Sequence, residues 1–328
     1  MSTRVLLLGL ASILLVALTG RLISRHVFSE DSGVTSAMAA VEAPSAKEVL
    51  IDKKFPATSG ENLEVKVGHS DVTIKTGSGN GAHVQVIVSG GNMKRAREFF
   101  EHLKFRVEKN GRTISVTTNP TQRNWSWNWG RVDIDVLITV PEVFDAQVAV
   151  AHGDVEVNRL KGTLSFTTAH GDLHIGSLSG STASITSAHG DVDAQEIATE
   201  KFRLSAAHGD VHIDRLATAA FEATAAHGDI EIENAEGRAE VSSSHGDIDI
   251  RFAREVSGEF TNSHGDIEIS APSALAANVD FEGSDVEIAG SYSFEGTQKR
   301  DRIEGKINGG GPSLSARTTH GSISLRAN

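Results

Sequence analysis

The stretch "TTAHGDLHI" at residues 167–175 decides the fold, because the His-Gly-Asp tripeptide inside it recurs along the chain. Successive copies are 18 or 19 residues apart. The seven copies begin at His152, His170, His189, His208, His227, His245 and His264. Such regular self-similarity indicates a repeat architecture, in which units too small to bury a core alone stack on one another.

The residues around each copy alternate between apolar and polar types, which is typical of β-strands. Leu164 and Phe166 lie six and four residues before His170, and Leu173 and Ile175 lie three and five residues after it. We therefore predict an all-β fold, a parallel β-solenoid of about 19-residue two-strand coils. In each coil the two strands are joined by the His-Gly-Asp turn and by a looser turn, such as "LSGST" after Ile175 and Gly176.

The chain divides by composition into four segments. Residues 1–28 are an apolar membrane anchor or signal segment, and residues 29–47 are small and polar, as in a flexible tether. Residues 48–143 alternate as short strands, and residues 144–328 carry the repeats. Within the third segment, residues 92–104 have helical periodicity, so we expect one short helix there.

The apolar run near the N-terminus predicts export. Its 16 residues, flanked by Arg4 and Arg21, are long for a signal-peptide core and short for the ~20 residues that span a bilayer. Snorkelling of Arg21 extends the span to Ile23. We expect residues 5–23 to form a retained membrane anchor, with a cleaved signal as the alternative. Both place the repeats in the cell envelope or periplasm.

Composition excludes several classes of site. The formal net charge of -12 argues against nucleic acid as a partner, because phosphate binding needs a basic surface. Cysteine is absent, so the chain has neither disulfides nor thiolate metal sites. The 32 glycines and the low aromatic content of 5% suit a β-protein with many tight turns.

Three sequence features together resemble a known family. They are the recurring Gly-Asp-[Val/Ile]-x-[Val/Ile], "VDIDVLITVPE" at residues 132–142 and "GGGPSLSARTTHGSISL" at residues 309–325. These are similar to a bacterial β-strand-repeat family of unknown function labelled adhesin-like. The resemblance covers about residues 48–328 and implies an exported solenoid with no established enzymatic activity. That family usually has a small residue before the glycine, so the resemblance does not explain the histidines.

Equivalent residues of stacked coils line up, so the corners predict one row of imidazoles and one row of carboxylates. Carboxylates with neutral imidazoles suit Zn²⁺, and carboxylates alone suit Ca²⁺. One hypothesis is therefore a Zn or Ca site along the corner. Its ligands would come from His152, Asp154, His170, Asp172, His189, Asp191, His208, Asp210, His227, Asp229, His245, Asp247, His264 and Asp266.

The alternative for the corner is structural. Glycine supplies the positive φ of a tight turn, and each aspartate accepts hydrogen bonds from N–H groups two residues on. The imidazoles stack, hydrogen-bond the next coil and neutralise the aspartates, which raises the histidine pKa. His69-Ser70-Asp71 reads as an incomplete coil, and Gly283-Ser284-Asp285 and His320-Gly321-Ser322 read as caps. A ladder used for binding is therefore expected from His152 to Asp266 and not beyond.

A surface for a basic partner is the third interpretation of the repeats. The residues four positions after each histidine share a face with the corner aspartates and add further carboxylates to it. The tryptophans of "RNWSWNWGR" alternate, which favours their packing onto the N-terminal end of the solenoid or the helix; the alternatives are an exposed platform for a sugar or a partner, or a membrane-interface belt. The partner, an envelope protein or polymer, would contact Trp125, Trp127, Trp129, Glu156, His174, Asp193, His212, Glu231, Asp249 and Glu268.

These patterns favour a non-catalytic binding or scaffold protein of the cell envelope. Seven equivalent His-Gly-Asp copies are the opposite of one unique catalytic pocket, and no catalytic motif such as Gly-x-Ser-x-Gly occurs in the sequence. The adhesin-like function displays an acidic, histidine-edged face to cations or to a basic partner. Its alternatives are a purely structural envelope or stress-related rod and a metal-binding repeat protein.

Overall fold

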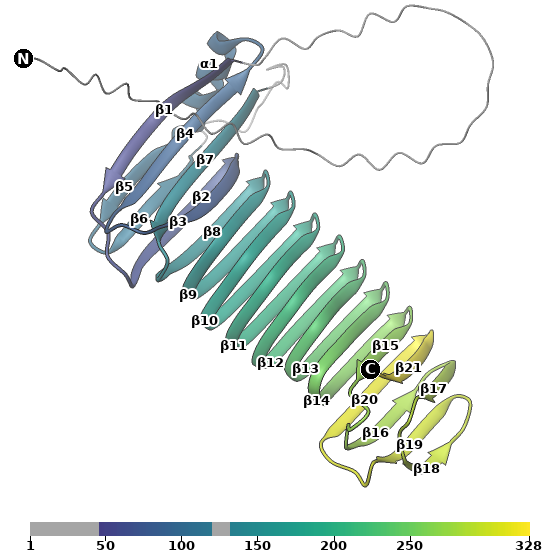
Figure 1. Cartoon of the computed structure of the whole chain (residues 1–328). Helices are drawn as coiled ribbons and strands as arrows, with labels where there is room; N and C mark the ends of the chain where they lie inside the picture. Colours follow the sequence, from purple (N-terminus) through teal and green to yellow (C-terminus); the bar gives the residue numbers. More distant parts are fainter. Residues whose placement is uncertain (1–45, 120–131) are drawn as a thin grey trace, which may run out of the picture. The chain divides into compact units, whose positions relative to one another are not determined.

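The computed structural model describes residues 46–119 and 132–328 (Figure 1). The described residues all belong to one structural unit. Long strands stack in its centre, one for each coil: β9 (Val155–His170), β10 (Leu173–His189), β11 (Val192–His208), β12 (Val211–His227), β13 (Ile230–His245) and β14 (Ile248–His264). Each strand pairs in parallel with the strands before and after it, which confirms the predicted parallel stacking of the repeats.

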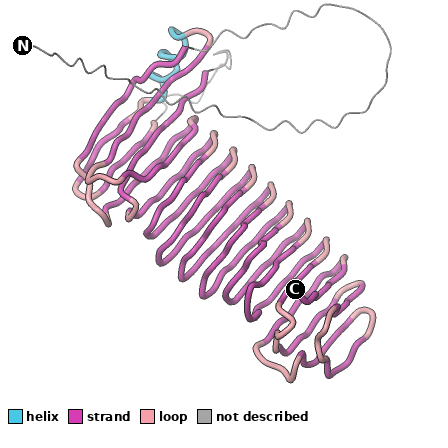
Figure 2. The backbone as a smooth tube through the Cα atoms, viewed as in Figure 1, coloured by secondary structure: helices cyan, strands magenta, loops and turns pink. Residues whose placement is uncertain are grey.

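Each coil is one bent strand, which corrects the prediction of two strands joined by a looser turn. Ser179 and Gly180 lie in the predicted turn, yet they pair with Ala198 and Thr199 of the next coil. Figure 2 shows the strand colour continuing around this bend, with loops at the opposite corner. Backbone groups in the bend can pair between coils because every coil bends at the same place. Below, the first limb is the half after the His-Gly-Asp turn, and the second limb is the half before the next histidine.

The interior of the stack contains the apolar positions that the sequence predicted. In β11 the first limb contributes Val192, Ala194 and Ile197, and the second limb contributes Phe202 and Leu204, all of them buried. The parallel register places each of these over its equivalent, so the core is continuous along the stack. Burial of each large apolar side chain contributes about 1.5–3 kcal/mol.

The N-terminal end of the stack is made of shorter strands that add to the same ladders. β2 (Glu61–His69) pairs with β8 (Phe144–His152), and β3 (Asp71–Gly77) pairs with β9. The His69-Ser70-Asp71 turn therefore belongs to a further coil, which lies directly on the first His-Gly-Asp coil. In the sequence, this further coil is far from the coil on which it lies.

Antiparallel strands end the stack on this side. On one limb β6 (Thr113–Thr117) pairs with β2, and β5 (Arg106–Asn110) closes the Asn110-Gly111 hairpin predicted from the sequence. On the other limb the order is β3, β7 (Val132–Pro141), β4 (Ala82–Gly90) and β1 (Ala46–Phe55).

The predicted helix is α1 (Met93–Leu103), the one α-helix among the described residues. It starts at Asn92, whose side chain accepts hydrogen bonds from two backbone N–H groups of the first turn. It ends at Lys104, which adopts the left-handed conformation with φ of 50°. Ala96 and Leu103 are buried and attach the helix to the sheet.

The C-terminal end reverses the order of two coils. β15 (Ile267–Ala271) leaves the last His-Gly-Asp turn, but the strands that pair with β14 and β15 are β20 (Ser313–His320) and β21 (Ser322–Ala327). β16 (Ala277–Glu282) and β17 (Asp285–Ala289) come earlier in sequence and pair outside them. β19 (Arg302–Ile307) and β18 (Phe294–Gln298) add antiparallel strands to this end.

Two predictions fall on residues that the structure does not describe. The expected anchor at residues 5–23 lies outside the described residues, and so do Trp125, Trp127 and Trp129. Within the described ranges, no helix has the length and apolarity needed to cross a membrane.

Candidate functional site

Glycine at each corner has the structural role that the sequence predicted. Gly209 has a φ of 118°, and a Cβ placed on it would lie 2.3 Å from the carbonyl oxygen of Gly190. Such a contact with backbone cannot be relieved by a side-chain movement. The glycines of all seven copies have φ between 116° and 133°. No other residue type fits this corner without strain.

The corner aspartates bind the backbone of the next coil, not of their own turn. The N–H of Asp210 donates to Oδ1 of Asp191 at 2.8 Å, and the N–H of Asp191 donates to Oδ1 of Asp172 at 2.9 Å. The first bond of the row is accepted by Asp71, and the last is donated by Ser322. We call this row the aspartate ladder; it comprises Asp71, Asp154, Asp172, Asp191, Asp210, Asp229, Asp247 and Asp266.

This arrangement corrects the predicted Asp-turn bond two residues along the chain. Consecutive bonds of the ladder within the repeats join residues 18 or 19 positions apart. One oxygen of each corner carboxylate is therefore used to hold two coils together. A carboxylate that accepts a backbone N–H makes a charge-assisted hydrogen bond, which is among the stronger hydrogen bonds of proteins.

The corner histidines form one column of parallel rings. Ring centroids of successive histidines are 4.6–4.8 Å apart, and the ring planes differ by at most 19°. The histidine column comprises His69, His152, His170, His189, His208, His227, His245, His264 and His320. The column thus extends beyond both predicted ends, because β2 and β20 continue the ladders of the repeats.

The raised histidine pKa predicted for the corner is wrong at the N-terminal end of the column. Burial, and then the neighbouring His152, lower the pKa of His69. Burial and the neighbouring His170 likewise lower the pKa of His152. Between residues 152 and 266, all of them described, no ion pair joins a corner histidine to a corner aspartate. The aspartates are satisfied by backbone N–H groups instead, and each imidazole lies against another imidazole.

The metal site along the corner stays a prediction. The stacked rings limit how such a site could bind an ion. A metal bound by an imidazole lies in the plane of the ring, along the nitrogen lone pair. Neighbouring rings such as those of His189 and His208 are parallel within 1° and 4.8 Å apart, so their planes do not meet. Two successive histidines therefore cannot share one ion while they remain stacked. Each would have to bind singly, with carboxylates as its partners.

Polar residues buried beneath the corner were missed from the sequence. Ser187 donates to the carbonyl of Gly190, Asn262 to that of Gly246 and Thr318 to that of Gly265. They satisfy corner carbonyls that point into the stack. The signal was a hydroxyl or amide two positions before the histidine, found in Thr168, Ser187, Ser243, Asn262 and Thr318.

The first limbs present a row of charged residues to solvent. Parallel register places His174 beside Asp193, Asp193 beside His212, and His212 beside Glu231. The side chains of His174 and Asp193 are 55% and 57% exposed. We call this row the acidic stripe; it comprises Glu156, His174, Asp193, His212, Glu231, Asp249 and Glu268. The structure therefore brings together the partner-binding residues predicted in the repeats.

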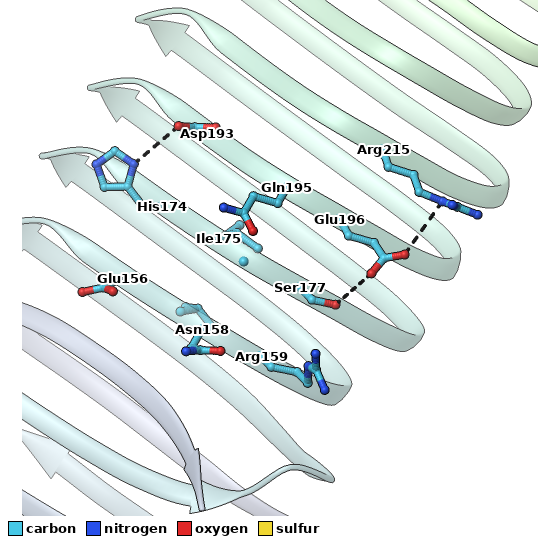
Figure 3. Close-up of a pocket in the computed structure, with 12 residues that line it drawn as sticks. Glu156, Asn158, Arg159, His174, Ile175, Ser177, Asp193, Gln195, Glu196 and Arg215 are labelled. Atoms are coloured by element: carbon cyan, nitrogen blue, oxygen red, sulfur yellow. Dashed lines mark hydrogen bonds and ion pairs between the residues drawn. The ribbon is translucent and has the colours of Figure 1, made fainter. Parts of the chain in front are cut away.

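A groove of about 580 Å³ lies across the first limbs of β9, β10 and β11 (Figure 3). Gly176 forms its floor, and the longer side chains of Asn158 and Gln195 occupy the equivalent positions in the coils on either side. A Cβ at Gly176 would lie 2.2 Å from the carbonyl oxygen of Asn158, so this position has no room for a side chain. The sequence signal was a single glycine in a row whose other members all carry polar or charged side chains.

Charged groups line both sides of this groove. Along one side lie Glu156, His174 and Asp193 of the acidic stripe, with His174 Nδ1 at 3.9 Å from Asp193 Oδ2. Along the other side, Glu196 accepts a hydrogen bond from Ser177 and pairs with Arg215 at 3.8 Å. Figure 3 shows these side chains projecting from successive coils. The groove can accept a cationic group through the carboxylates that no arginine neutralises.

This protein is a stack of coils that all turn at a corner of the same conformation. Its sequence matches one family model over residues 60–326. That model describes the toastrack family, DUF4097. The chain belongs to the toastrack DUF4097 family. The family resemblance noted from the repeats is thereby confirmed. A comparison with curated proteins found no match.

Several solved structures are similar to this toastrack chain. A "putative adhesin" from Bacteroides fragilis is 13% identical, with a TM-score of 0.44 over 85% of this chain and 98% of its own. A "putative lipid binding protein" from Parabacteroides distasonis is 13% identical, with a TM-score of 0.47 over 85% and 96%. A "putative adhesin" from Parabacteroides merdae is 9% identical, with a TM-score of 0.47 over 85% and 96%.

Proposed function

We propose that this protein is a non-catalytic β-solenoid rod of the cell envelope that binds a basic macromolecule along its acidic stripe. The observation that carries the proposal is the groove over Gly176, which opens the stripe between Asn158 and Gln195. In this proposal the apolar segment at residues 5–23 exports the rod and holds it at the membrane, and the partner is a cationic envelope protein or polymer.

The charges of the acidic stripe support a cationic partner. Carboxylates one strand apart repel each other by about 0.9 kcal/mol in water and by more near protein. At Asp249, burial and then the neighbouring Glu268 and Glu231 raise the pKa of the carboxyl group. A lysine- or arginine-rich partner relieves the repulsion when it binds, which favours association.

The donors and acceptors in the groove fit the same class of ligand. The side chains of Asn158 and Gln195 supply amide oxygens, and Glu156 and Asp193 supply carboxylates. Ammonium and guanidinium groups are donors without acceptors, so they suit the side of the groove that carries Glu156 and Asp193, away from Arg159 and Arg215, which also line it. An extended basic chain that lies across the coils can place one such group in the groove and others along the stripe.

Binding of poly-L-lysine by the full-length chain tests this proposal. The variant Glu156→Gln/Asp193→Asn/Asp249→Asn neutralises three carboxylates of the stripe. The matched control Glu222→Gln/Glu240→Gln/Glu259→Gln neutralises three exposed carboxylates of the second limbs. We expect the first variant to bind about tenfold more weakly than the wild type, since an exposed ion pair contributes about 0.2–1 kcal/mol, and the control to bind nearly as well. Equal loss in both variants contradicts a specific surface.

A purely structural rod is the second candidate function, and the corner favours it. The aspartate ladder and the histidine column both use their functional groups between coils. A rod of this kind needs no ligand at the repeats. If the protein is such a rod, neutralising the three stripe carboxylates should weaken polycation binding no more than neutralising the three second-limb carboxylates, because both changes alter the net charge equally.

A further inference from the structure

One histidine of the acidic stripe is surrounded by carboxylates in a way that no other is. His212 Nε2 lies 2.9 Å from Asp214 Oδ1 on the same strand, and His212 Nδ1 lies 3.2 Å from Glu231 Oε2 on the next strand. A fourth residue, Glu233, completes the group. Ligand atoms of His212, Asp214 and Glu233 all lie within 4.8 Å of one another. We propose that these three residues bind one divalent transition-metal ion of the Zn²⁺ type.

The backbone places these side chains on one face. His212 and Glu231 are direct partners in the parallel pairing of β12 and β13. Asp214 and Glu233 each follow two residues later, so alternation turns them to the same side of the sheet. The site therefore rests on two hydrogen-bonded strands of the rod. The side chain of Asp214 is 50% exposed, and that of His212 is 37% exposed, so an ion can enter from solvent.

Glu231 has a different role from the other two carboxylates. It lies on Nδ1 of His212, the ring nitrogen on the far side from Asp214. Histidines that bind metals usually donate their second ring N–H to a carboxylate, which fixes the tautomer and the ring orientation. Glu231 therefore acts as a positioning residue, and the ligands are Nε2 of His212 with the carboxylates of Asp214 and Glu233.

The donor set selects the class of ion. One imidazole nitrogen with two carboxylates suits Zn²⁺ and its neighbours in the transition series, whereas Ca²⁺ and Mg²⁺ prefer oxygen ligands alone. Three protein ligands leave room for water on the metal, as in open zinc sites. Within residues 132–328, no lysine or arginine pairs with Asp214, Glu231 or Glu233. The contact that a bound ion has to displace is the one between Nε2 of His212 and Asp214.

The same rod contains a natural control two coils earlier. His174 occupies the position equivalent to His212, and Asp193 lies beside it in the place of Glu231. Gly176 stands where Asp214 would be, and Gln195 stands where Glu233 would be. His174 therefore has a carboxylate neighbour but lacks both proposed carboxylate ligands. In the coil after β13, Arg251 occupies the position equivalent to Glu233, so the group of carboxylates does not continue into that coil.

Calorimetric titration of the chelator-stripped full-length chain with ZnCl₂ tests the site. The variant Asp214→Asn/Glu233→Gln should bind one ion fewer than the wild type, and His174→Asn should bind as many as the wild type. Glu231→Gln should weaken this binding about 10- to 100-fold. The same number of ions and the same affinity in the wild type and in Asp214→Asn/Glu233→Gln overturn the proposal.

A second measurement keeps the test decisive if the double variant does not fold. In nitrogen NMR spectra of the wild type, one equivalent of Zn²⁺ should shift Nε2 of His212 and leave Nε2 of His174 in place. A first equivalent that shifts the histidine column instead overturns the proposal. His212 and Glu231 belong to the acidic stripe, but the two proposals can fail separately, because the stripe variant used to test polycation binding retains His212, Asp214, Glu231 and Glu233.

Discussion

Asp191 accepts a hydrogen bond from the backbone N–H of Asp210 at 2.8 Å, although 19 residues separate the two. The bond joins the same atoms in adjacent coils, and it recurs from Asp71 to Ser322. The corner carboxylates thus act as rungs between coils. This explains why aspartate stands at every corner without requiring that a ligand bind there.

Replacement of one rung should destabilise the rod without affecting the stripe. Asp191→Ala leaves the N–H of Asp210 without its acceptor, and we expect a loss of about 1–2 kcal/mol, because hydrogen bonds to charged groups contribute ~1.5–3 kcal/mol and this one is exposed. Asp191→Asn retains a carbonyl acceptor and should lose less. Urea denaturation followed by circular dichroism measures both. Equal stability of the alanine variant and the wild type would refute the ladder as a stabilising element.

Glycine at the corner should be irreplaceable. Gly209→Ala combines a positive φ with a backbone contact of 2.3 Å, and we expect it to lower the free energy of unfolding by about 1–3 kcal/mol. Gly91→Ala is the matched control, because a Cβ at Gly91 meets nothing within 4 Å. Thermal unfolding compares the two variants. Equal unfolding temperatures of Gly209→Ala and Gly91→Ala would contradict the structural role of the corner glycine.

The histidine column should make the N-terminal part of the rod less stable in mild acid. The lowered pKa values of His69 and His152 mean that the folded chain binds protons less readily than the unfolded chain, whose histidines titrate near 6.5. The stabilisation is therefore fully present above about pH 6.5 and is lost as the pH falls toward the folded pKa values. Denaturation at pH 7.5 and pH 5.5 should show this loss, and His69→Gln/His152→Gln should reduce it.

His212 should show the opposite pH dependence. Its pKa is raised in the folded chain, so its contribution is fully present below about pH 6.5 and is lost as the pH rises through the folded value. His212→Asn should therefore destabilise the chain more at pH 5.5 than at pH 8. A histidine titration followed by NMR gives the pKa directly. A value for His212 below that of an ordinary histidine would contradict the geometry around it.

The sequence was sufficient for the local structure of the coils. Alternation around His170 placed Phe166 and Leu173 in the core, and helical periodicity placed α1 within one residue at each end. Both follow from short-range patterns of burial, which a single repeat already contains. The glycine of each turn was likewise predictable, since its conformation is a local requirement.

Contacts between segments far apart in sequence were not predictable in the same way. His69 and His320 join the histidine column because β2 and β20 pair beside the repeats, and the reversed order of β16 and β20 at the C-terminal end has no periodic signal. The partner of Asp191 is in the next coil, so the turn sequence alone suggested a local acceptor role. The groove depends on Gly176 lying between Asn158 and Gln195, which becomes meaningful only when the coils are aligned in space.

The most direct test of the account is the affinity of full-length protein for poly-L-lysine when either the corner or the stripe is changed. The corner variant is His189→Ser/His208→Ser, and the stripe variant is Glu156→Gln/Asp193→Asn/Asp249→Asn. The corner variant should be less stable but bind the polycation as the wild type does, while the stripe variant should bind about tenfold more weakly. Loss of binding in the folded corner variant, with binding retained by the stripe variant, would contradict binding at the acidic stripe.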